Sequence, residues 1–239
     1  MLNKARGHLY LIPVPIDQDS NACILLEKYR KIVETLDHFI VENEKTARFY
    51  LSTLDLKKPI NQLHFNVLDK ASSPDEITTY LHPLLEGSHI GLLSESGCPA
   101  VADPGSKMIA LAHKNSIKVI PLIGPSSIVL ALMASGLNGQ QFKFHGYLPS
   151  EKDKRIKKII GIENESKKSH ETQIFIETPF RNQRLFNDLL DNLHEKTNLC
   201  VAINITSEDE YILTRDIKGW RQEKLLDLKN KPCVFLIQT

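Results

Sequence analysis

Small residues, prolines and carboxylates gather in four short segments, each at or directly after the end of a predicted strand or at a predicted domain junction. The segments are Pro13-Val14-Pro15, Glu42-Asn43-Glu44, residues 94–104 and residues 124–127. Glycine lets the backbone approach a ligand closely, proline holds a loop rigid, and hydroxyl groups donate hydrogen bonds. In open α/β sheets, ligands bind beyond the carboxyl ends of the strands, where such loops meet. The four segments therefore predict a site for a small molecule.

Several common catalytic motifs are absent from the sequence. No G-x-G-x-x-G follows a predicted strand and no G-x-x-x-x-G-K-[ST] occurs, which excludes a dinucleotide fingerprint and a P-loop. G-x-S-x-G is absent as well, so no α/β-hydrolase nucleophile is indicated. The histidines show neither H-x-x-x-H nor H-E-x-x-H spacing, and no catalytic metal is expected.

Cys98 lies inside the segment 94–104. A nucleophilic cysteine needs a nearby positive charge that favours the thiolate, and the sequence shows no such partner, so a small apolar role is expected. The other cysteines, Cys23, Cys200 and Cys233, are widely spaced and form no C-x-x-C pair. This spacing argues against a zinc site and a disulfide scaffold, and it predicts a cytoplasmic protein.

Residues 151–168 are rich in lysine and arginine, with seven basic residues against four acidic ones. Two interpretations stay open for this segment: a solvated helix face, or a patch that contacts phosphate groups. Arg181 either belongs to the same patch or pairs with Glu177. Because the chain has 30 Lys and Arg against 29 Asp and Glu, any binding of nucleic acid must come from a local patch.

The first half of the chain alternates predicted strands and helices. The strands are expected at 9–15, 38–41, 63–67, 89–93 and 117–123, and the helices at 22–36, 47–54, 73–86 and 104–115. This alternation predicts a mostly parallel sheet. Ser73-Pro74-Asp75-Glu76 has the pattern of a capping box with proline at the first helical position, which marks a helix start.

The second half predicts a mixed sheet. Strands are expected at 142–148, 171–178, 199–206, 211–220 and 233–238, and helices at 128–135, 151–161 and 181–194. The last three strands lack crossover helices between every pair, and 199–220 indicates a hairpin. With 239 residues, 41% of them hydrophobic and 25% charged, the chain is expected to form two α/β domains, 1–121 and 122–239. The uncharged stretch 119–142 is interrupted by proline and glycine, so no membrane contact is expected.

Five segments in order resemble the signatures of the tetrapyrrole-methylase-like superfamily. Three of them, 7–15, 94–105 and 120–127, resemble the superfamily as a whole. The other two, 144–149 and 177–181, resemble the branch that methylates a ribose 2′-hydroxyl in small-subunit ribosomal RNA. The resemblance covers nearly the whole chain, and five ordered motifs are far more specific than any one of them.

The resemblance implies a homodimeric methyltransferase of two α/β domains, with S-adenosylmethionine in the cleft between the domains and RNA or a ribosomal subunit as the substrate. It assigns contacts with the cofactor to residues in both halves of the chain. They are Pro13, Val14, Ser94, Gly97, Cys98, Val101, Ser126, Ser127, Ile176, Glu177 and Pro232.

Methyl transfer from a sulfonium asks little of side chains, because the methyl group is already activated and the acceptor mainly has to be positioned. An oxygen acceptor also benefits from a group that takes its proton. Glu42, Glu44 and Glu95 are the candidates for that role, whereas Asp103 is expected to be structural at the start of a helix.

The chain departs from the ribosomal branch in three loops. It has V-P-I-D-Q at 14–18 where that branch has T-P-I-G-N, E-N-E-K at 42–45 where it has E-D-T-R, and E-S-G-C-P at 95–99 where it has D-A-G-T-P. We also expect a further C-terminal extension of that branch to be absent. Because the changes include the mouth of the expected substrate site, two alternatives stay open: methylation of a tetrapyrrole or other metabolite, and cofactor binding without catalysis.

Overall fold

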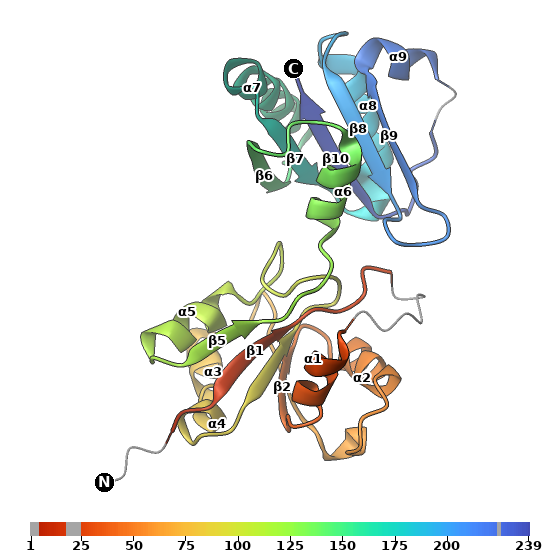
Figure 1. Cartoon of the computed structure of the whole chain (residues 1–239). Coiled ribbons are helices and arrows are strands. Elements are labelled where there is room, and N and C mark those ends of the chain that lie inside the picture. Colours follow the sequence, from red (N-terminus) through yellow and green to blue (C-terminus); the bar gives the residue numbers. More distant parts are fainter. Residues whose placement is uncertain (1–4, 18–24, 224–225) are drawn as a thin grey trace. The chain divides into compact units, whose positions relative to one another are not determined.

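The computed structural model describes residues 5–17, 25–223 and 226–239. The chain folds into two compact units, residues 1–126 and 127–239 (Figure 1). The sequence placed the division at residue 121, ahead of a loop that the structure assigns to the first unit. Cys23 and the first residues of the helix expected at 22–36 lie outside the described residues.

The N-terminal unit alternates strands and helices, as predicted. Its elements are β1 (His8–Ile12), α1 (Glu27–Val33), β2 (His38–Val41), α2 (Glu44–Thr53), η1 (Ile60–Gln62), β3 (His64–Val67), α3 (Pro74–Thr79), α4 (His82–Leu85), β4 (Ile90–Leu93), α5 (Ser106–Lys114) and β5 (Lys118–Pro121). The strands form a parallel sheet of order β3-β2-β4-β1-β5. Every residue of the central strand β4 is buried, as expected for a strand covered on both faces.

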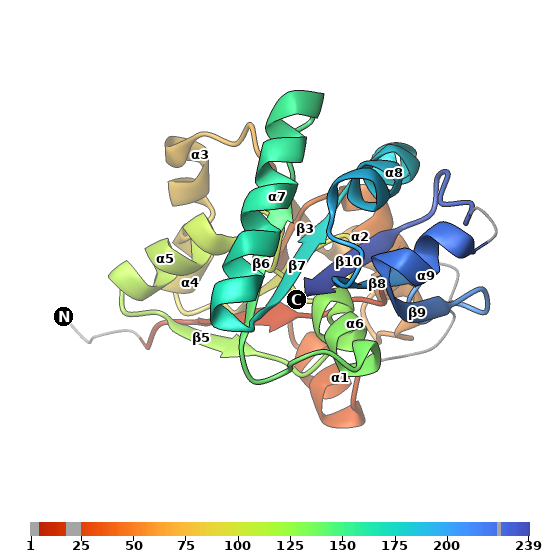
Figure 2. The ribbon, with the colours of Figure 1, turned by 90° about the horizontal axis from the view of Figure 1, so that it is seen from above.

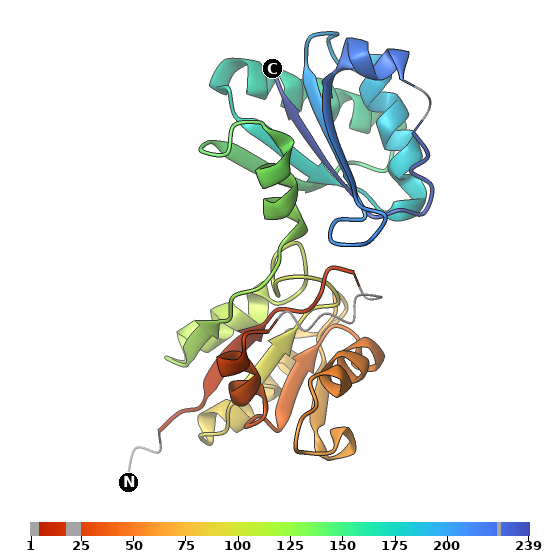
Figure 3. The same ribbon diagram turned by 45° about the vertical axis from the view of Figure 1, so that its right-hand side comes forward.

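Helices cover both faces of this sheet (Figures 1 and 3). On one face, α1 and α2 pack against a cluster that includes Ile12, Phe39 and Leu51. On the other, α3, α4 and α5 pack against a cluster that includes Leu9 and Met108. The β-strands therefore sit between two apolar layers, with their carboxyl ends leading into loops.

The helix expected at 73–86 is two short helices, α3 and α4. Its start is confirmed, because Ser73 Oγ accepts from Glu76 N at 3.2 Å and the Glu76 carboxylate accepts from Ser73 N at 2.8 Å. Pro83 explains the break, since proline lacks an N–H for a continuing helix and lies instead in the first turn of α4.

The C-terminal unit is a mixed sheet with helices on both faces. Its elements are α6 (Ser127–Ser135), β6 (Phe142–Tyr147), α7 (Lys152–Ser169), β7 (Thr172–Ile176), η2 (Pro179–Arg181), α8 (Asn182–Asn192), β8 (Asn198–Ile203), β9 (Tyr211–Asp216), α9 (Ile217–Gln222) and β10 (Cys233–Gln238). The order is β6-β7-β10-β8-β9, with β6 and β7 parallel and the remaining pairs antiparallel. The predicted mixed sheet and the β8–β9 hairpin are confirmed.

The sheet separates the core of this unit into two apolar clusters, one on each face. Helices α7, α8 and α9 pack on one face around Phe175, Phe186 and Trp220, and α7 lies beside α8 (Figure 2). Helix α6 packs on the other face through Ile128 and Leu132. None of the helices in the described part of the chain is long and apolar enough to cross a membrane.

The prediction of a strand at 211–220 is wrong beyond residue 216. Asp216 ends β9 and caps α9, since its side chain accepts from Gly219 N at 2.7 Å. Ile217 and Trp220 then lie three residues apart on a helix, and both are buried. Their apolar side chains contribute to the core from a helix rather than from a strand.

Candidate functional site

A topological switch point lies between β1 and β4 of the N-terminal unit. These strands are neighbours, with Ile12 opposite Leu93, yet their connections leave in opposite directions. The chain goes from β1 through α1 to β2, and from β4 through α5 to β5, with the two helices on opposite faces. Ligands of open α/β sheets bind at such a point, beyond the carboxyl ends of the strands.

The loops that follow β1 and β4 are joined at this point. Val14 and Gly97 form an antiparallel bridge, in which Val14 N donates to Gly97 O at 3.0 Å and Gly97 N donates to Val14 O at 3.2 Å. Gly97 has a φ of +70°, which favours glycine, and an added Cβ would lie 3.2 Å from the carbonyl oxygen of Pro125. Gly97 thus allows the loops after β1, β4 and β5 to approach one another closely.

The loop after β5 also packs against the loop after β1. A Cβ built on Gly124 would lie 2.1 Å from Cβ of Pro13, so only glycine fits there. On its other side, Pro13 is held by the buried Tyr50, whose hydroxyl donates to the Pro13 carbonyl at 3.2 Å. Rigid backbone from three loops therefore surrounds the switch point.

The thiol of Cys98 faces the loop after β5. Its Sγ lies 3.1 Å from the carbonyl oxygen of Pro125 and 3.6 Å from that of Gly124. Burial raises the pKa of the Cys98 thiol above its usual value, so the protonated form is favoured at neutral pH. The geometry supports the predicted structural role for Cys98 and gives no basis for a nucleophile.

Two of the predicted carboxylates lie together at the carboxyl ends of β2 and β4. Glu42 Oε2 accepts from the backbone N–H of Glu95 at 3.3 Å, and Glu95 Oε1 accepts from Thr46 Oγ1 at 3.4 Å. The side chain of Asn43 caps α2 by accepting from Lys45 N at 2.9 Å, which holds the strand end in place. Asn43, and not Glu42, is therefore the N-cap of α2.

Asp103 joins these carboxylates, which the sequence did not predict. Burial raises the pKa of Asp103 to about 7, and the charges of Glu42 and Glu95 add to the rise. Burial likewise raises the pKa of Glu42, with the Glu95 charge adding to it, while the Glu95 backbone N–H and the charge of Lys70 lower it. Helix α5 starts at Ser106 with Gly105 at its N-cap, so Asp103 does not cap it.

Glu44 lies outside this carboxylate group. Its Oε1 accepts from Nε and Nη2 of Arg48 at 2.8 and 2.7 Å, one turn along α2. The same guanidinium donates to the Ile60 carbonyl at 3.1 Å and lies over the ring of Phe65. Glu44 therefore holds Arg48 and η1 against α2, which is a structural role.

The other residues assigned to the cofactor between the end of β4 and the start of α6 differ in how far their side chains are exposed. The Ser94 hydroxyl is buried and donates within its own loop, to the carbonyls of Ser96 at 3.3 Å and Gly97 at 3.4 Å. Val101 is exposed, and it lies between Ala100 and Ala102, which have φ values of +65° and +68°. Ser126 and Ser127, where the chain enters α6, are half-buried.

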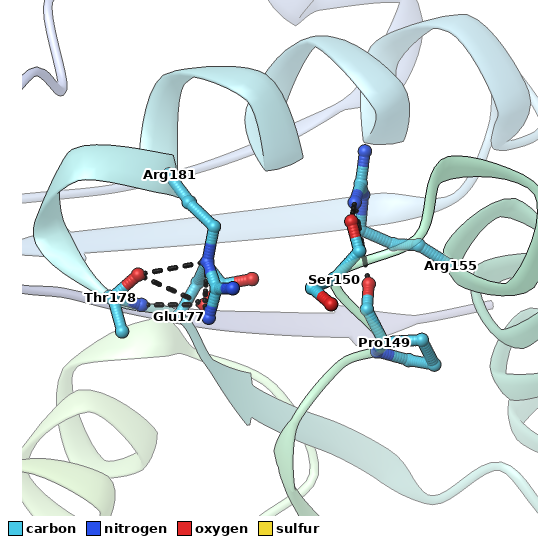
Figure 4. Close-up of polar contacts among 6 residues, drawn as sticks. All are labelled: Pro149, Ser150, Arg155, Glu177, Thr178 and Arg181. Atoms are coloured by element: carbon cyan, nitrogen blue, oxygen red, sulfur yellow. Dashed lines mark hydrogen bonds and ion pairs between the residues drawn. The ribbon is translucent and has the colours of Figure 1, made fainter.

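In the C-terminal unit, Glu177 organises the turn after β7 (Figure 4). Its Oε1 accepts from Thr178 N at 2.7 Å and from Arg181 Nη2 at 2.6 Å. The side chain of Glu177 is 1% exposed. Of the two interpretations left open for Arg181, the ion pair with Glu177 is confirmed.

Ile176 and Pro232 lie at the same edge of the C-terminal sheet. Ile176 is opposite Val234 in the β7–β10 ladder, and the Pro232 carbonyl accepts from Asn204 N at 3.0 Å. The edge therefore combines the ends of β7 and β8 with the start of β10. The structure leaves the contacts predicted between these residues and a cofactor untested.

Arg155 corrects the phosphate-patch interpretation of residues 151–168. It is 1% exposed and its Nη2 lies 2.6 Å from Asp188 Oδ2. Its Nη1 donates to the Ser150 carbonyl at 2.7 Å and to the Pro149 carbonyl at 3.3 Å (Figure 4). Arg155 thus joins α7, α8 and the loop after β6, and only exposed residues of α7 can contact phosphate.

Sequence reasoning missed two contributors to the N-terminal site, Asp103 and Lys70. Asp103 belongs to the segment 94–104, which the rule on strand ends had already selected, so that rule could have found it. Lys70 follows β3 and lowers the pKa of both Glu42 and Asp103. Its loop has no glycine or proline signal that would have marked it.

Comparison with curated proteins gives relatives over most of the chain. "Ribosomal RNA small subunit methyltransferase I" of Buchnera aphidicola subsp. Schizaphis graminum is 31% identical over 99% of this chain and 79% of that protein. The chain belongs to this family. The proteins of the same name from Vibrio cholerae and Pasteurella multocida are 30% and 29% identical over 85% and 92% of the chain, and over 67% and 74% of their own lengths.

Solved structures agree on the fold of this family member. The crystal structure of the methyltransferase CobJ matches with a TM-score of 0.63 and 14% identity, over 98% of this chain and 94% of that one. Uroporphyrin-III-C-methyltransferase from Thermus thermophilus matches with a TM-score of 0.54 and 16% identity, over 98% and 92%. No protein-family model matches the chain. The predicted tetrapyrrole-methylase-like fold and the prediction of a methyltransferase are confirmed.

Proposed function

We propose that this family member transfers a methyl group from S-adenosylmethionine to a ribose 2′-hydroxyl of small-subunit ribosomal RNA. The observation that carries the proposal is its membership in a family whose members are named for that RNA. The carboxylates at the switch point support an oxygen acceptor, because an alcohol has to lose a proton when it is methylated. The matches to CobJ and the uroporphyrin enzyme support the fold alone and do not favour a tetrapyrrole acceptor.

The residues present at the switch point fit S-adenosylmethionine. Gly97 and Gly124 hold three loops so close that backbone groups, rather than long side chains, line the point where they meet. The nearby carboxylates suit a ligand that carries a sulfonium and an ammonium group. The cofactor supplies a methyl group that is already activated as a sulfonium substituent.

We assign the binding of this cofactor to two groups of residues. In the N-terminal unit, Pro13, Val14, Gly97, Cys98 and Val101 would offer backbone and apolar contacts, with Ser126 as a hydroxyl donor, while Ser94 shapes the loop. Ser127, the first residue of the C-terminal unit, would be a second hydroxyl donor. In the C-terminal unit, Ile176 and Pro232 would offer apolar contacts, and the buried Glu177 would hold their edge of the sheet in shape.

We assign the removal of the acceptor proton to Glu42, with Glu95 and Asp103 tuning it. A general base works best when its pKa lies near the working pH. Burial raises the pKa of Glu42, and the charge of Glu95 raises it further. Asp103 has a pKa of about 7 and titrates beside Glu42. The three carboxyl groups of Glu42, Glu95 and Asp103 together therefore lose their last proton near neutral pH.

Replacement of Asp103 by asparagine tests this coupling through the pH dependence of kcat. Protonation of the carboxylate group removes the base, so kcat is expected to rise with pH through about 7 in the parent chain. The substitution removes the carboxylate whose pKa is about 7, and it leaves Glu42, whose own pKa is raised by burial and by the charge of Glu95. The rising limb of the pH profile is therefore expected to move to lower pH, and a limb that stays in place would contradict the coupling.

We also propose that the protein is a cytoplasmic homodimer. Helix α6 supports the dimer, because its sequence is apolar on all sides and its Val129 and Met133 side chains are 49% and 74% exposed. The free Cys98, Cys200 and Cys233 support a reducing compartment. Sedimentation equilibrium would give the mass of two chains, and Met133→Lys would lower it to that of one.

The experiment that tests the methyl acceptor is transfer of a labelled methyl group into an extract of cells that lack this protein. After incubation with labelled S-adenosylmethionine, RNA, protein and small molecules are separated and counted. Label in small-subunit RNA supports the proposal, whereas label in small molecules favours the tetrapyrrole or metabolite alternative. Isothermal titration of the cofactor distinguishes both outcomes from a chain that does not bind it.

A further inference from the structure

Phe180 stands out on the turn after β7 because its large apolar side chain is 72% exposed. It is the middle residue of η2, between Pro179 and Arg181. A phenylalanine in this position contributes little to the core of its own unit and loses apolar contact with water only when something covers it. The surroundings of the ring indicate what that partner is.

Hydrogen bonds to buried and backbone groups hold the turn that carries Phe180 in place. Glu177, whose side chain is 1% exposed, holds the two ends of the turn by accepting from Thr178 N and Arg181 Nη2 at 2.7 and 2.6 Å. The Pro179 carbonyl accepts from Asn230 N at 3.2 Å. The ring is thus presented by a turn with little freedom, so its binding costs little conformational entropy.

A second exposed aromatic side chain lies at the same corner of the sheet. Tyr147 ends β6 opposite Ile176 of β7, and it is 51% exposed. The loop that follows Tyr147 is held by the buried guanidinium of Arg155 through the carbonyls of Pro149 and Ser150 (Figure 4). Two adjacent, anchored strand ends therefore each carry an exposed aromatic residue.

Two arginine side chains lie on the turn after β7 and on the helix that follows it. The Arg181 guanidinium lies 5.3 Å from the centre of the Phe180 ring, and Arg184, in the first turn of α8, is exposed. Acidic residues are present as well: Glu177 pairs with Arg181, and the exposed Glu151 and Asp153 lie where the loop after β6 enters α7. Arg184 therefore offers an exposed positive charge to an anionic partner of this turn.

We propose that Phe180 stacks on an unpaired base of the RNA substrate, with Tyr147 at the same corner of the sheet and Arg184 facing the phosphates. Exposed aromatic rings next to arginine are the groups with which proteins bind unstacked bases of single-stranded RNA. The inference rests on the RNA acceptor of the proposed function and adds the surface that holds it. It places RNA contacts on the C-terminal unit, whereas the carboxylates for proton removal are on the N-terminal unit.

The test compares RNA affinity among variants of the full chain at fixed salt. Phe180→Ala is expected to weaken binding of a short single-stranded oligoadenylate, followed by fluorescence anisotropy, by about tenfold. Phe180→Trp is expected to keep the affinity, whereas Phe180→Leu, which is apolar but cannot stack, is expected to lose it. Phe142→Ala is the matched control, because Phe142 is also exposed but lies at the opposite end of β6.

The outcomes separate this inference from the proposed function. If the parent chain binds no RNA and methylates none, the proposed function and the inference both fail. If the parent chain binds RNA and Phe180→Ala binds it equally well, only the inference is overturned. A Phe180→Ala variant that loses affinity for S-adenosylmethionine while keeping its RNA affinity would assign the ring to the cofactor and would also overturn it.

Discussion

Glutamine in place of Glu42 is expected to lower kcat for methyl transfer by about 10²- to 10⁴-fold, the range for loss of a general base. Glutamine keeps the shape of the side chain and can still accept the Glu95 N–H, which donates to Glu42 at 3.3 Å, so the loop should hold its geometry. Affinity for S-adenosylmethionine, measured by isothermal titration, should therefore change little while kcat falls.

Glu44→Gln is the informative comparison for Glu42→Gln. It lies two residues away and removes the same charge, but the structure engages Glu44 with Arg48 on the surface of α2. An exposed pair of this kind contributes only about 0.5 kcal/mol, so both stability and kcat should stay close to those of the parent chain. Equal losses in the two variants, or a Glu42→Gln variant with the parent rate, would remove Glu42 from the proposed role.

The second large effect is on stability. Alanine in place of Arg155 leaves Asp188 buried without its ion partner, which lies 2.6 Å away in the parent chain. Breaking a buried pair in this way costs about 3–5 kcal/mol of unfolding free energy. The loop after β6 also loses the hydrogen bonds that its Pro149 and Ser150 carbonyls accept.

Urea unfolding followed by the fluorescence of Trp220 measures this loss. Trp220 is the single tryptophan of the chain and is buried in the same core as α7 and α8, so it reports on the C-terminal unit. Lys154→Ala, which removes an exposed pair with Glu151, should cost less than about 1 kcal/mol. The double variant Arg155→Met, Asp188→Leu should recover the part of the loss that comes from the unpaired Asp188, and a double variant as unstable as Arg155→Ala would contradict an electrostatic contribution.

Local rules account for the parts of the fold that the sequence predicts. The alternation of apolar strands and amphipathic helices predicts the parallel N-terminal sheet, and the capping box at Ser73 predicts a helix start that the structure has. The rule on strand ends brings Val14, Glu42, Glu95 and Gly97 to one edge. These features depend on spacing along the chain, which a sequence displays directly.

Long-range features could not be predicted from the sequence. The insertion of β4 between β2 and β1 depends on the packing of whole helices, and no local pattern encodes that order. Arginine is usually a surface residue, so the sequence gives no sign that Arg155 is buried. Its burial becomes favourable only because Asp188, on a different helix, pairs with it. The pKa of Asp103, raised to about 7, likewise depends on carboxylates that are distant in sequence.

The most direct test of the proposed reaction identifies the methylated nucleoside. Small ribosomal subunits assembled with unmodified RNA are incubated with this protein and labelled S-adenosylmethionine, and the RNA is digested to nucleosides and separated by chromatography. The account predicts label in a 2′-O-methylated nucleoside, present with the parent chain and lost with Glu42→Gln. Label on a base, or no label in RNA while a small metabolite is methylated, would contradict it.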